Sequence, residues 1–259
     1  MGAILLLFGG LKAAAQFMAQ LGEPTLNEFQ AYVNRIESEC QARWSGKRAD
    51  LWLEEHPAEH SAAKAGKLII QPMNEGGAFA IKHGLVHDWM GAAFIPGTTL
   101  ARVLSVLQDF DNHQKYFPEI VRSRTLQRNG NTVKGYWRLK RTQIITVVLD
   151  VEQVASYEET RSGLWHCRAT TTKISEVDDA GTATDNDLPP DDGHGYLWRL
   201  NAYWNLKAVP EGVYAECRTL SLSRDIPFGL NFAVKPFIQS LPRASLESTL
   251  TGLKKAAAE

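Results

Sequence analysis

Apolar and polar residues alternate most regularly in the stretch YLWRLNAYWNLKAV, which begins at Tyr196. Side chains two apart in a β-strand point to the same side, so this alternation predicts a strand with two unlike faces. The apolar face holds Tyr196, Trp198, Leu200, Ala202, Trp204 and Leu206. The polar face holds Arg199, Asn201, Asn205 and Lys207. One buried and one polar face are typical of an antiparallel sheet.

Other segments rich in β-forming residues lie between Gly, Pro and Asn turn signals and predict further strands. They are residues 67–73, 78–95, 121–127, 132–141, 144–154, 164–177 and 213–224. The sequence RNGN places Asn129 and Gly130 between two of them, which predicts a hairpin. The sequence therefore predicts a long run of antiparallel strands in the second half of the chain.

Helical spacing marks three regions. In residues 25–44 the apolar positions are Leu26, Phe29, Val33, Ile36 and Cys40, with Thr25 and Glu28 as an expected capping box and an end near Ser45 and Gly46. Residues 98–110 carry one stripe of Leu100, Val103, Leu104 and Leu107, capped by Thr98 or Thr99. The last 33 residues form a long helix with Phe228, Phe232, Phe237, Ile238, Leu246, Leu250 and Leu253, which Pro236 and Pro242 are expected to kink or split.

This pattern divides the chain into three parts. Residues 1–20 form an expected leader, because Ala3 to Phe8 are apolar and small residues follow, although the first cation is only Lys12. Export to the periplasm or outside the cell is one alternative, and a cytoplasmic protein is the other. Residues 21–66 form an N-terminal helical extension, and residues 67–259 form the main domain, in which residues 67–82 are expected to add a hairpin.

Composition narrows the function classes. The 259 residues are 44% hydrophobic and 22% charged, which suits one sizeable core, and the net charge of −1 gives no general attraction to nucleic acid. Cys40, Cys167 and Cys217 are far apart and odd in number, so we expect buried thiols and neither disulfides nor a metal site. The oligomeric state stays open.

The element order is strand, two short helices, many antiparallel strands and a long helix, which predicts an α+β fold. The apolar face of such a sheet must be covered, and only the final helix is long and apolar enough to cover it. A sheet curled around a helix leaves an elongated apolar cavity where the inward side chains do not fill it.

The layout resembles the helix-grip fold of the START and polyketide-cyclase-like (Bet v 1-like) superfamily. The resemblance is carried by TTLARVLSVLQDFDNHQKYFPEIVRSRTL, by LSLSRDIP before the final helix and by PRASLESTLTGLKK within it, and covers about residues 84–256. It implies a curved antiparallel sheet wrapped around the C-terminal helix. It also implies a hydrophobic ligand, such as a lipid, isoprenoid or polyketide, held in the cavity for carriage or sensing, with transient membrane contact.

We expect the cavity wall to contain Trp137, Leu149, Trp198, Trp204 and Leu220, facing Phe232, Phe237 and Leu241 of the final helix. Phe110, Tyr116 and Phe117 lie in LQDFDNHQKYFPEI, ahead of Pro118, and either line the mouth of the cavity or fill the core. Arg224 and Asp225 either anchor a polar head group or form an ion pair at the turn into the final helix.

No catalytic or metal-binding motif is evident, and no cofactor is expected. His56 and His60 flank Pro57, His83 and His87 are expected to share one strand face, and Asp185, Asp187, Asp191 and Asp192 do not match a calcium loop. Arg138 and Asp150 are expected to face outward, while the direction of His166 and Arg168 stays open. The leading hypothesis is a non-catalytic binding protein; the alternatives are a cyclase or dehydratase, or a protein-interaction module that uses the N-terminal helix.

Overall fold

The computed structural model describes residues 18–142, 145–225 and 231–259, with the side chains of residues 231–240 outside this description. The predicted leader therefore lies almost wholly outside the described residues. The helical elements are α2 (Glu23–Trp44), η1 (Leu53–Glu55), α3 (Pro57–Lys64), η2 (Glu75–Gly77), α4 (Leu100–Gln108), α5 (His113–Tyr116) and α6 (Asn231–Ala258). The long strands are β4 (Gly84–Pro96), β5 (Ile120–Asn129), β6 (Thr132–Thr142), β7 (Thr146–Arg161), β8 (Leu164–Asp178), β11 (Arg199–Val209) and β12 (Gly212–Arg224). The short strands are β1 (Ala19–Gln20), β2 (Ile69–Pro72), β3 (Ala78–Ile81), β9 (Asn186–Asp187) and β10 (Asp192–Gly193).

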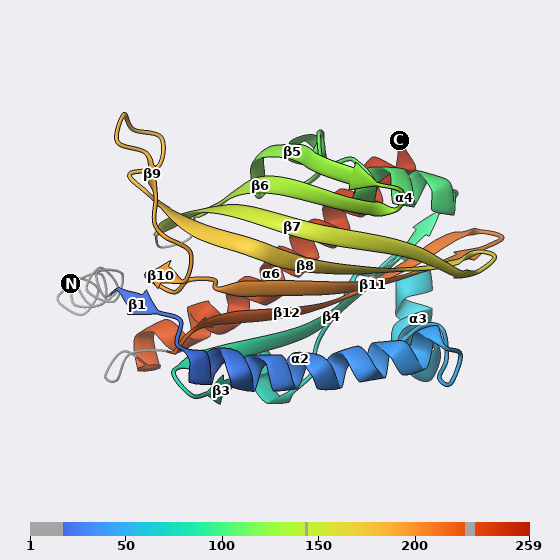
Figure 1. Cartoon of the computed structure of the whole chain (residues 1–259). Coiled ribbons are helices and arrows are strands. Elements are labelled where there is room, and N and C mark those ends of the chain that lie inside the picture. Colours follow the sequence, from blue (N-terminus) through green and yellow to red (C-terminus); the bar gives the residue numbers. More distant parts are fainter. Residues whose placement is uncertain (1–17, 143–144, 226–230) are drawn as a thin grey trace, which may run out of the picture.

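One large antiparallel sheet forms the centre of the molecule, in the order β2-β4-β12-β11-β8-β7-β6-β5. Helix α2 runs along one face, and α4, α5 and α6 lie on the other (Figure 1). We call the face toward α6 the inner face and the face toward α2 the outer face. The predicted α+β fold, with a sheet packed against the C-terminal helix and an added N-terminal helix, is confirmed.

Helix α6 spans the open side of the curved sheet from one edge to the other. It packs directly on β4, where a Cβ on Gly91 would lie 2.6 Å from Leu250. Near the opposite edge, Arg141 at the end of β6 donates to the carbonyl oxygen of Leu241 at 3.2 Å and to the Ser245 hydroxyl. Pro236 and Pro242 do not split the helix, which is continuous from Asn231 to Ala258.

The outer face is covered by α2, whose apolar stripe is buried against the sheet. Phe29, Val33 and Ile36 pack with Tyr203 and Leu222. The predicted capping box is wrong, because the helix begins at Glu23 with Pro24 in its first turn, and a proline's fixed φ favours that position. Thr25 consequently lies inside the helix and is buried.

A buried ion pair and a buried carboxylate fasten this layer. Arg218 donates two hydrogen bonds to Asp88, at 2.9 and 2.7 Å, and Tyr32 of α2 donates a third at 2.6 Å. Glu216, which is fully buried, accepts the backbone N–H groups of residues 52 and 53. Burial raises the pKa of Glu216 to about 7. The N-terminal extension is thus packed on the same sheet as the main domain.

The predicted hairpin of residues 67–82 takes a different form. Strands β2 and β3 do not pair with each other; both pair with the edge of β4, Ile69 opposite Ala92 and Ala78 opposite His87. Apolar runs give the strands but not their partners, because pairing depends on the path of the connecting loop. The loop 73–77 therefore lies beside the middle of β4.

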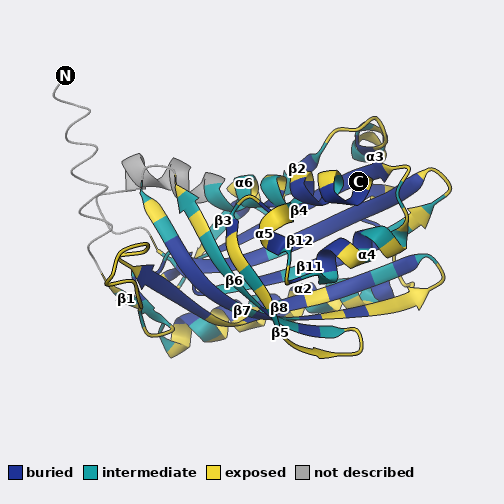
Figure 2. Ribbon diagram, turned by 90° about the horizontal axis from the view of Figure 1, so that it is seen from above, coloured by how far each residue is buried: buried dark blue, intermediate teal, exposed yellow. Residues whose placement is uncertain are grey.

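Two local predictions, the N-terminal cap of α4 and the hairpin between β5 and β6, are confirmed. Thr99 caps α4 by accepting from the backbone N–H of Arg102 at 3.2 Å. The hairpin between β5 and β6 is confirmed: Asn129 pairs with Thr132, and Gly130, at φ +55, forms the turn with Asn131. Burial along the strands is shown in Figure 2, where β12 is mostly buried and β5 mostly exposed.

Candidate functional site

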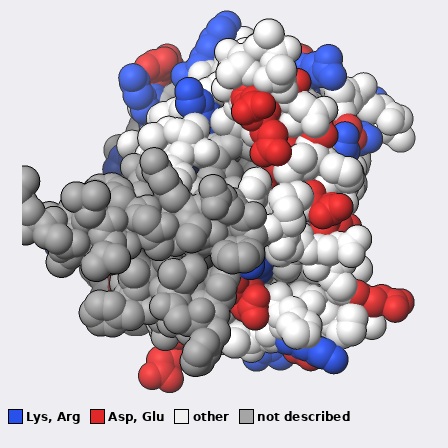
Figure 3. Space-filling view, turned by 90° about the vertical axis from the view of Figure 1, so that its left-hand side faces the viewer, with Lys and Arg blue, Asp and Glu red and all other residues white. Residues whose placement is uncertain are grey.

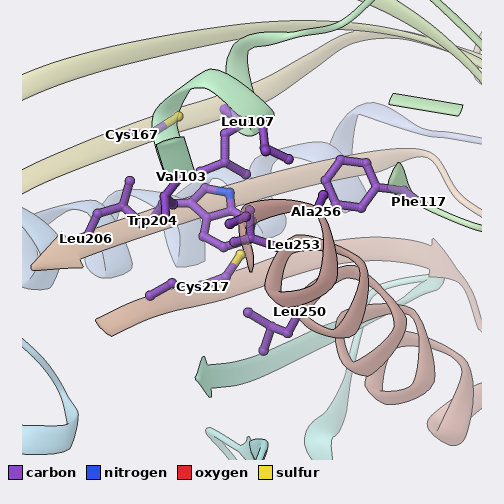
Figure 4. Close-up of a cluster of buried hydrophobic side chains, with 14 of the residues drawn as sticks. Val103, Leu107, Phe117, Cys167, Trp204, Leu206, Cys217, Leu250, Leu253 and Ala256 are labelled. Carbon is purple, nitrogen blue, oxygen red and sulfur yellow. The ribbon is translucent and has the colours of Figure 1, made fainter. Parts of the chain in front are cut away.

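The interface between the inner face and α6 has two unlike ends. At the end that carries α4, apolar side chains are almost completely buried; this packed end contains Val103, Leu107, Trp204, Leu206, Leu250 and Leu253. Figure 4 shows the Trp204 ring between α4 and the last turns of α6. Trp204 was expected to line a cavity, but it is only 7% exposed in this filled cluster.

The aromatic residues before Pro118 belong to the packed end. Phe110 lies flat on the backbone of β6, because a Cβ on Gly135 would come within 1.8 Å of its ring. Phe110 and Phe117 are buried, whereas Tyr116 is half-buried and donates to Asp109 at 2.9 Å. Of the two alternatives for these aromatics, the structure places Phe110 and Phe117 in the core.

His113, which sequence reasoning missed, organises this aromatic group. Its Nε2 lies 3.2 Å from the carbonyl oxygens of Val106 and Leu107, and its Nδ1 accepts from the Trp137 indole at 2.9 Å. Burial lowers its pKa to about 4, so the ring is neutral near pH 7. The hydrogen bond to His113 fixes the Trp137 ring, which stacks on Phe110 at 5.4 Å between centroids.

Toward the other end of the interface, inward side chains are less buried although α6 runs past them. Trp137, which stacks on Phe110, is half-buried and lies between the two ends; Leu139, Leu200, Ala202 and Thr219 are half-buried too, and we call these four the half-buried end. Neighbouring Leu149 forms a small buried cluster with Val151 and Ile174. Leu241 of α6 is half-buried too, while the side chains of Phe232 and Phe237 lie outside the described residues.

Polar groups accompany these apolar ones on the inner face. His87 of β4 is 3% exposed, and its Nε2 lies 3.0 Å from the Ser223 hydroxyl on β12. Burial lowers the pKa of His87 to about 4. Gln153 and Thr171 are buried on β7 and β8, directly opposite each other. The inner face therefore has an apolar wall with uncharged polar groups at one end.

Trp198 and Leu220 were expected in the cavity wall, and this assignment is wrong. Both are buried on the outer face, against α2, with Phe29 and Val33. The chain bends at Trp198, and β11 begins only at Arg199, so the side-to-side alternation does not extend back to Trp198. Leu220 pairs with Asn201, whose side chain belongs to the polar outer face of β11.

Arg224 is the last residue of β12, and Asp225 directly follows it. Arg224 donates to the carbonyl oxygen of His194 at 3.2 Å and is half-buried, while Asp225 is exposed. Arg224 thus holds the loop before β11, and the role of either residue as a polar anchor stays a prediction.

The polar residues weighed for catalysis lie away from the inner face. Arg138 and Asp150 form a bidentate pair at 2.7 and 2.6 Å, joined by Asp185 of the acidic loop at 2.9 Å. His166 stacks on Trp44 of α2, with ring centroids 4.1 Å apart. Arg168 also faces α2, 3.4 Å from Glu37. These residues fasten the loop and the outer helix.

The metal candidates are dispersed. His83 sits in the β3–β4 turn at φ +56 and does not share a strand face with His87, which corrects the predicted pair. His56 stacks on Trp52, and Asp191 pairs with Arg199. Within the described residues, no group of three or more His, Cys, Asp or Glu side chains is arranged to hold a metal ion.

Two surface hollows are lined by described residues. One of about 230 Å³ lies beside Glu176, His194 and Tyr196, where Glu176 accepts the backbone N–H groups of both other residues at 2.7 and 2.9 Å. Another of about 430 Å³ lies over Arg122 and Tyr136 at the sheet edge. Neither hollow is lined by a residue of the half-buried end.

No family model matches the sequence, and no curated protein is significantly similar to it. Solved structures with a similar fold include a STAR-related lipid transfer protein from Xanthomonas axonopodis, at 16% identity and TM-score 0.49 over 71% of this chain and 99% of that one. Human STARD10 is 12% identical, with TM-score 0.43 over 72% of this chain and 75% of that one. The Zhui aromatase/cyclase from a Streptomyces species is 10% identical, with TM-score 0.40 over 68% of this chain and 92% of that one. The structural neighbours are START and aromatase/cyclase helix-grip proteins, and at these identities the likeness concerns the fold.

Proposed function

We propose that the protein binds a hydrophobic small molecule or lipid between the half-buried end of the inner face and α6, for carriage or sensing and without catalysis. The observation that supports this proposal is the contrast along one interface. Leu206 and Leu253 are fully buried at the packed end, whereas Leu139, Leu200 and Ala202 keep solvent-accessible surface beneath a helix. An apolar ligand would gain about 25 cal/mol for each Å² of such surface removed from water.

The polar inner residues do not favour the alternative of an enzyme. His87 and Ser223 form the pair that most resembles a base and a nucleophile. The lowered pKa of His87 makes it a weak base near pH 7, and its Nδ1 has no carboxylate to orient it, as an activated serine requires. The pair is better suited to hydrogen bonding with a ligand than to chemistry on it.

The interaction-module alternative loses its main support. It relied on an exposed apolar stripe on the N-terminal helix, but Phe29, Val33 and Ile36 are buried against the sheet. On the face shown in Figure 3, Lys and Arg are interspersed with Asp and Glu over the described surface. No helix of the described residues is long and apolar enough to cross a membrane. The membrane contact that we propose is transient and serves ligand exchange.

The test is native mass spectrometry of the full chain, purified without detergent and then mixed with a panel of lipids. Wild-type protein is expected to retain a ligand, and Ala202→Phe to lose at least 10-fold in occupancy, because added bulk fills the half-buried end. Ala31→Phe is the matched control, since Ala31 is exposed on α2, which covers the outer face of the sheet (Figure 1). Equal occupancy in both variants, or no uptake by wild-type protein, would refute the proposal.

A further inference from the structure

Three polar residues come together where the loop 73–77 meets the inner face of β4. His87 and Trp89 lie two apart on β4 and therefore point to the same side. Gly77 packs on the Trp89 indole, and its backbone N–H donates to the carbonyl oxygen of Asn74 at 3.1 Å. Ala78 pairs with His87 and Pro72 with Trp89, so the loop between them lies alongside these two side chains.

Four polar atoms of these residues are buried and have no hydrogen-bond partner among the residues that the structure describes. They are His87 Nδ1, Trp89 Nε1, and Nδ2 and Oδ1 of Asn74. His87 and Trp89 are 3% and 7% exposed. A buried polar group without a partner costs about 1–3 kcal/mol, and most such groups in folded proteins are paired. Four such atoms, on two residues of one face of β4 and on the loop that packs against them, indicate a position that receives a polar partner.

The geometry around Gly77 keeps this arrangement in place. Gly77 has φ +75, and a Cβ there would lie 2.1 Å from the Trp89 ring and 2.8 Å from its Nε1. Only glycine accepts both that backbone conformation and so close a contact. The loop consequently lies flat on the indole edge, beside the polar atom that has no partner.

The chemistry of the four atoms defines the partner. Trp89 Nε1 and Asn74 Nδ2 donate, Asn74 Oδ1 accepts, and His87 Nδ1 donates or accepts according to its tautomer. None of the three side chains is charged at neutral pH, since burial lowers the pKa of His87 to about 4. A carboxylate or phosphate would be buried among them without a neutralising cation. A hydroxyl group carries no charge and both donates and accepts hydrogen bonds, and an ester group is uncharged too and accepts them.

We propose that Asn74, His87 and Trp89 form a subsite for the uncharged, hydroxyl-bearing head group of an amphiphile whose apolar tail lies along the half-buried end. The subsite rests on the proposed function and adds the class of ligand: monoacylglycerols, long-chain alcohols or sterols, rather than fatty acids or phospholipids. Trp89 also contacts the packed core, so its indole spans both environments.

The first test is NMR of the full-length protein with ¹⁵N-labelled tryptophan, titrated with 1-monolaurin, laurate or dodecane at pH 8. The Trp89 indole signal, assigned with Trp89→Phe, is expected to move downfield with monolaurin only, while the other indole signals serve as references. A Trp89 signal that no probe moves, although dodecane and monolaurin bind equally, would refute the subsite and leave the proposed function intact. Binding of none of the probes would refute both.

The second test separates a ligand role from a structural one. Asn74→Leu is expected to weaken monolaurin binding about 10-fold and leave dodecane binding unchanged, because one ligand hydrogen bond is lost. The same variant is expected to equal or exceed wild-type stability, since it removes an unpaired buried amide. Asn205→Leu is the control: its Oδ1 accepts from Trp44 at 2.7 Å on the outer face, so stability falls and binding does not change. Lower stability of Asn74→Leu with unaltered binding would overturn the inference.

Discussion

The two ends of the interface between the sheet and α6 use the same elements to different effect. At the packed end, α4 and α5 add side chains that fill the space above Trp204. At the half-buried end, β12 presents Thr219 and β11 presents Leu200 and Ala202 toward the side of the sheet that α6 crosses (Figure 1), and these side chains stay half-buried. The comparison shows that α4 and α5 determine which part of the inner face is filled as core.

Two buried histidines mark the same difference. Both His87 and His113 have a pKa lowered to about 4 by burial. His113, at the packed end, uses both ring nitrogens in hydrogen bonds within the protein. His87, on β4 beside the half-buried end, has no partner for Nδ1 among the described residues. The first ring completes the core, and the second is available to a ligand.

The largest difference is expected from a matched pair of truncations. Leu253→Ala, at the packed end, should lower the free energy of unfolding by about 2–5 kcal/mol, because it leaves a cavity in a filled core. Leu200→Ala should cost about 1 kcal/mol, because Leu200 is already half-buried. Urea unfolding of the unliganded proteins measures both. Equal losses would remove the distinction between the two ends.

Acid is expected to lower the free energy of unfolding through the two buried histidines. Their pKa is about 6.5 unfolded and about 4 folded, so the unfolded state binds more protons as pH falls from 6.5 to 4, and stability declines over that window. Each histidine contributes a decline of the order of 3 kcal/mol. Glu216 opposes it: with its pKa raised to about 7, the folded state keeps an extra proton between pH 7 and 4.5 and gains stability as pH falls.

The contribution of each histidine to this pH dependence is therefore measured by comparing a variant that lacks the histidine with the wild-type protein. His87→Leu and His113→Leu should each flatten the fall in unfolding free energy between pH 6.5 and 4, whatever they do to stability at pH 7. Urea unfolding at a series of pH values gives the slope. A variant that keeps the full wild-type slope would show that its histidine is protonated in the folded state as readily as in the unfolded one.

Much of the fold could be predicted from local chemistry. The β5–β6 hairpin, the Thr99 cap and the long apolar final helix each depend on residues close in sequence. The α+β fold followed because the final helix was expected to cover the apolar face of the sheet. The expectation about Thr25 was wrong, because Pro24 moved the start of the helix into the preceding residues.

The candidate site was predicted less well, because it depends on where strands begin and on what covers each face. Trp198 matched the alternation of β11, but the bend before Arg199 turns it toward α2. Trp204 does face inward, yet α4 and α6 fill the space around it. The sequence paired His87 with His83, and only the structure shows that His87 Nδ1 and Trp89 Nε1 have no partner among the described residues.

The most direct test of a ligand at the half-buried end is intermolecular NOE spectroscopy with methyl-labelled protein and 1-monolaurin. The predicted result is a set of NOEs from the lauroyl chain to the methyl groups of Leu139, Leu200 and Ala202, and none to Leu206 or Leu253. NOEs to the packed end or to Leu220 on the outer face, or no NOEs from a ligand shown to be bound, would contradict the account.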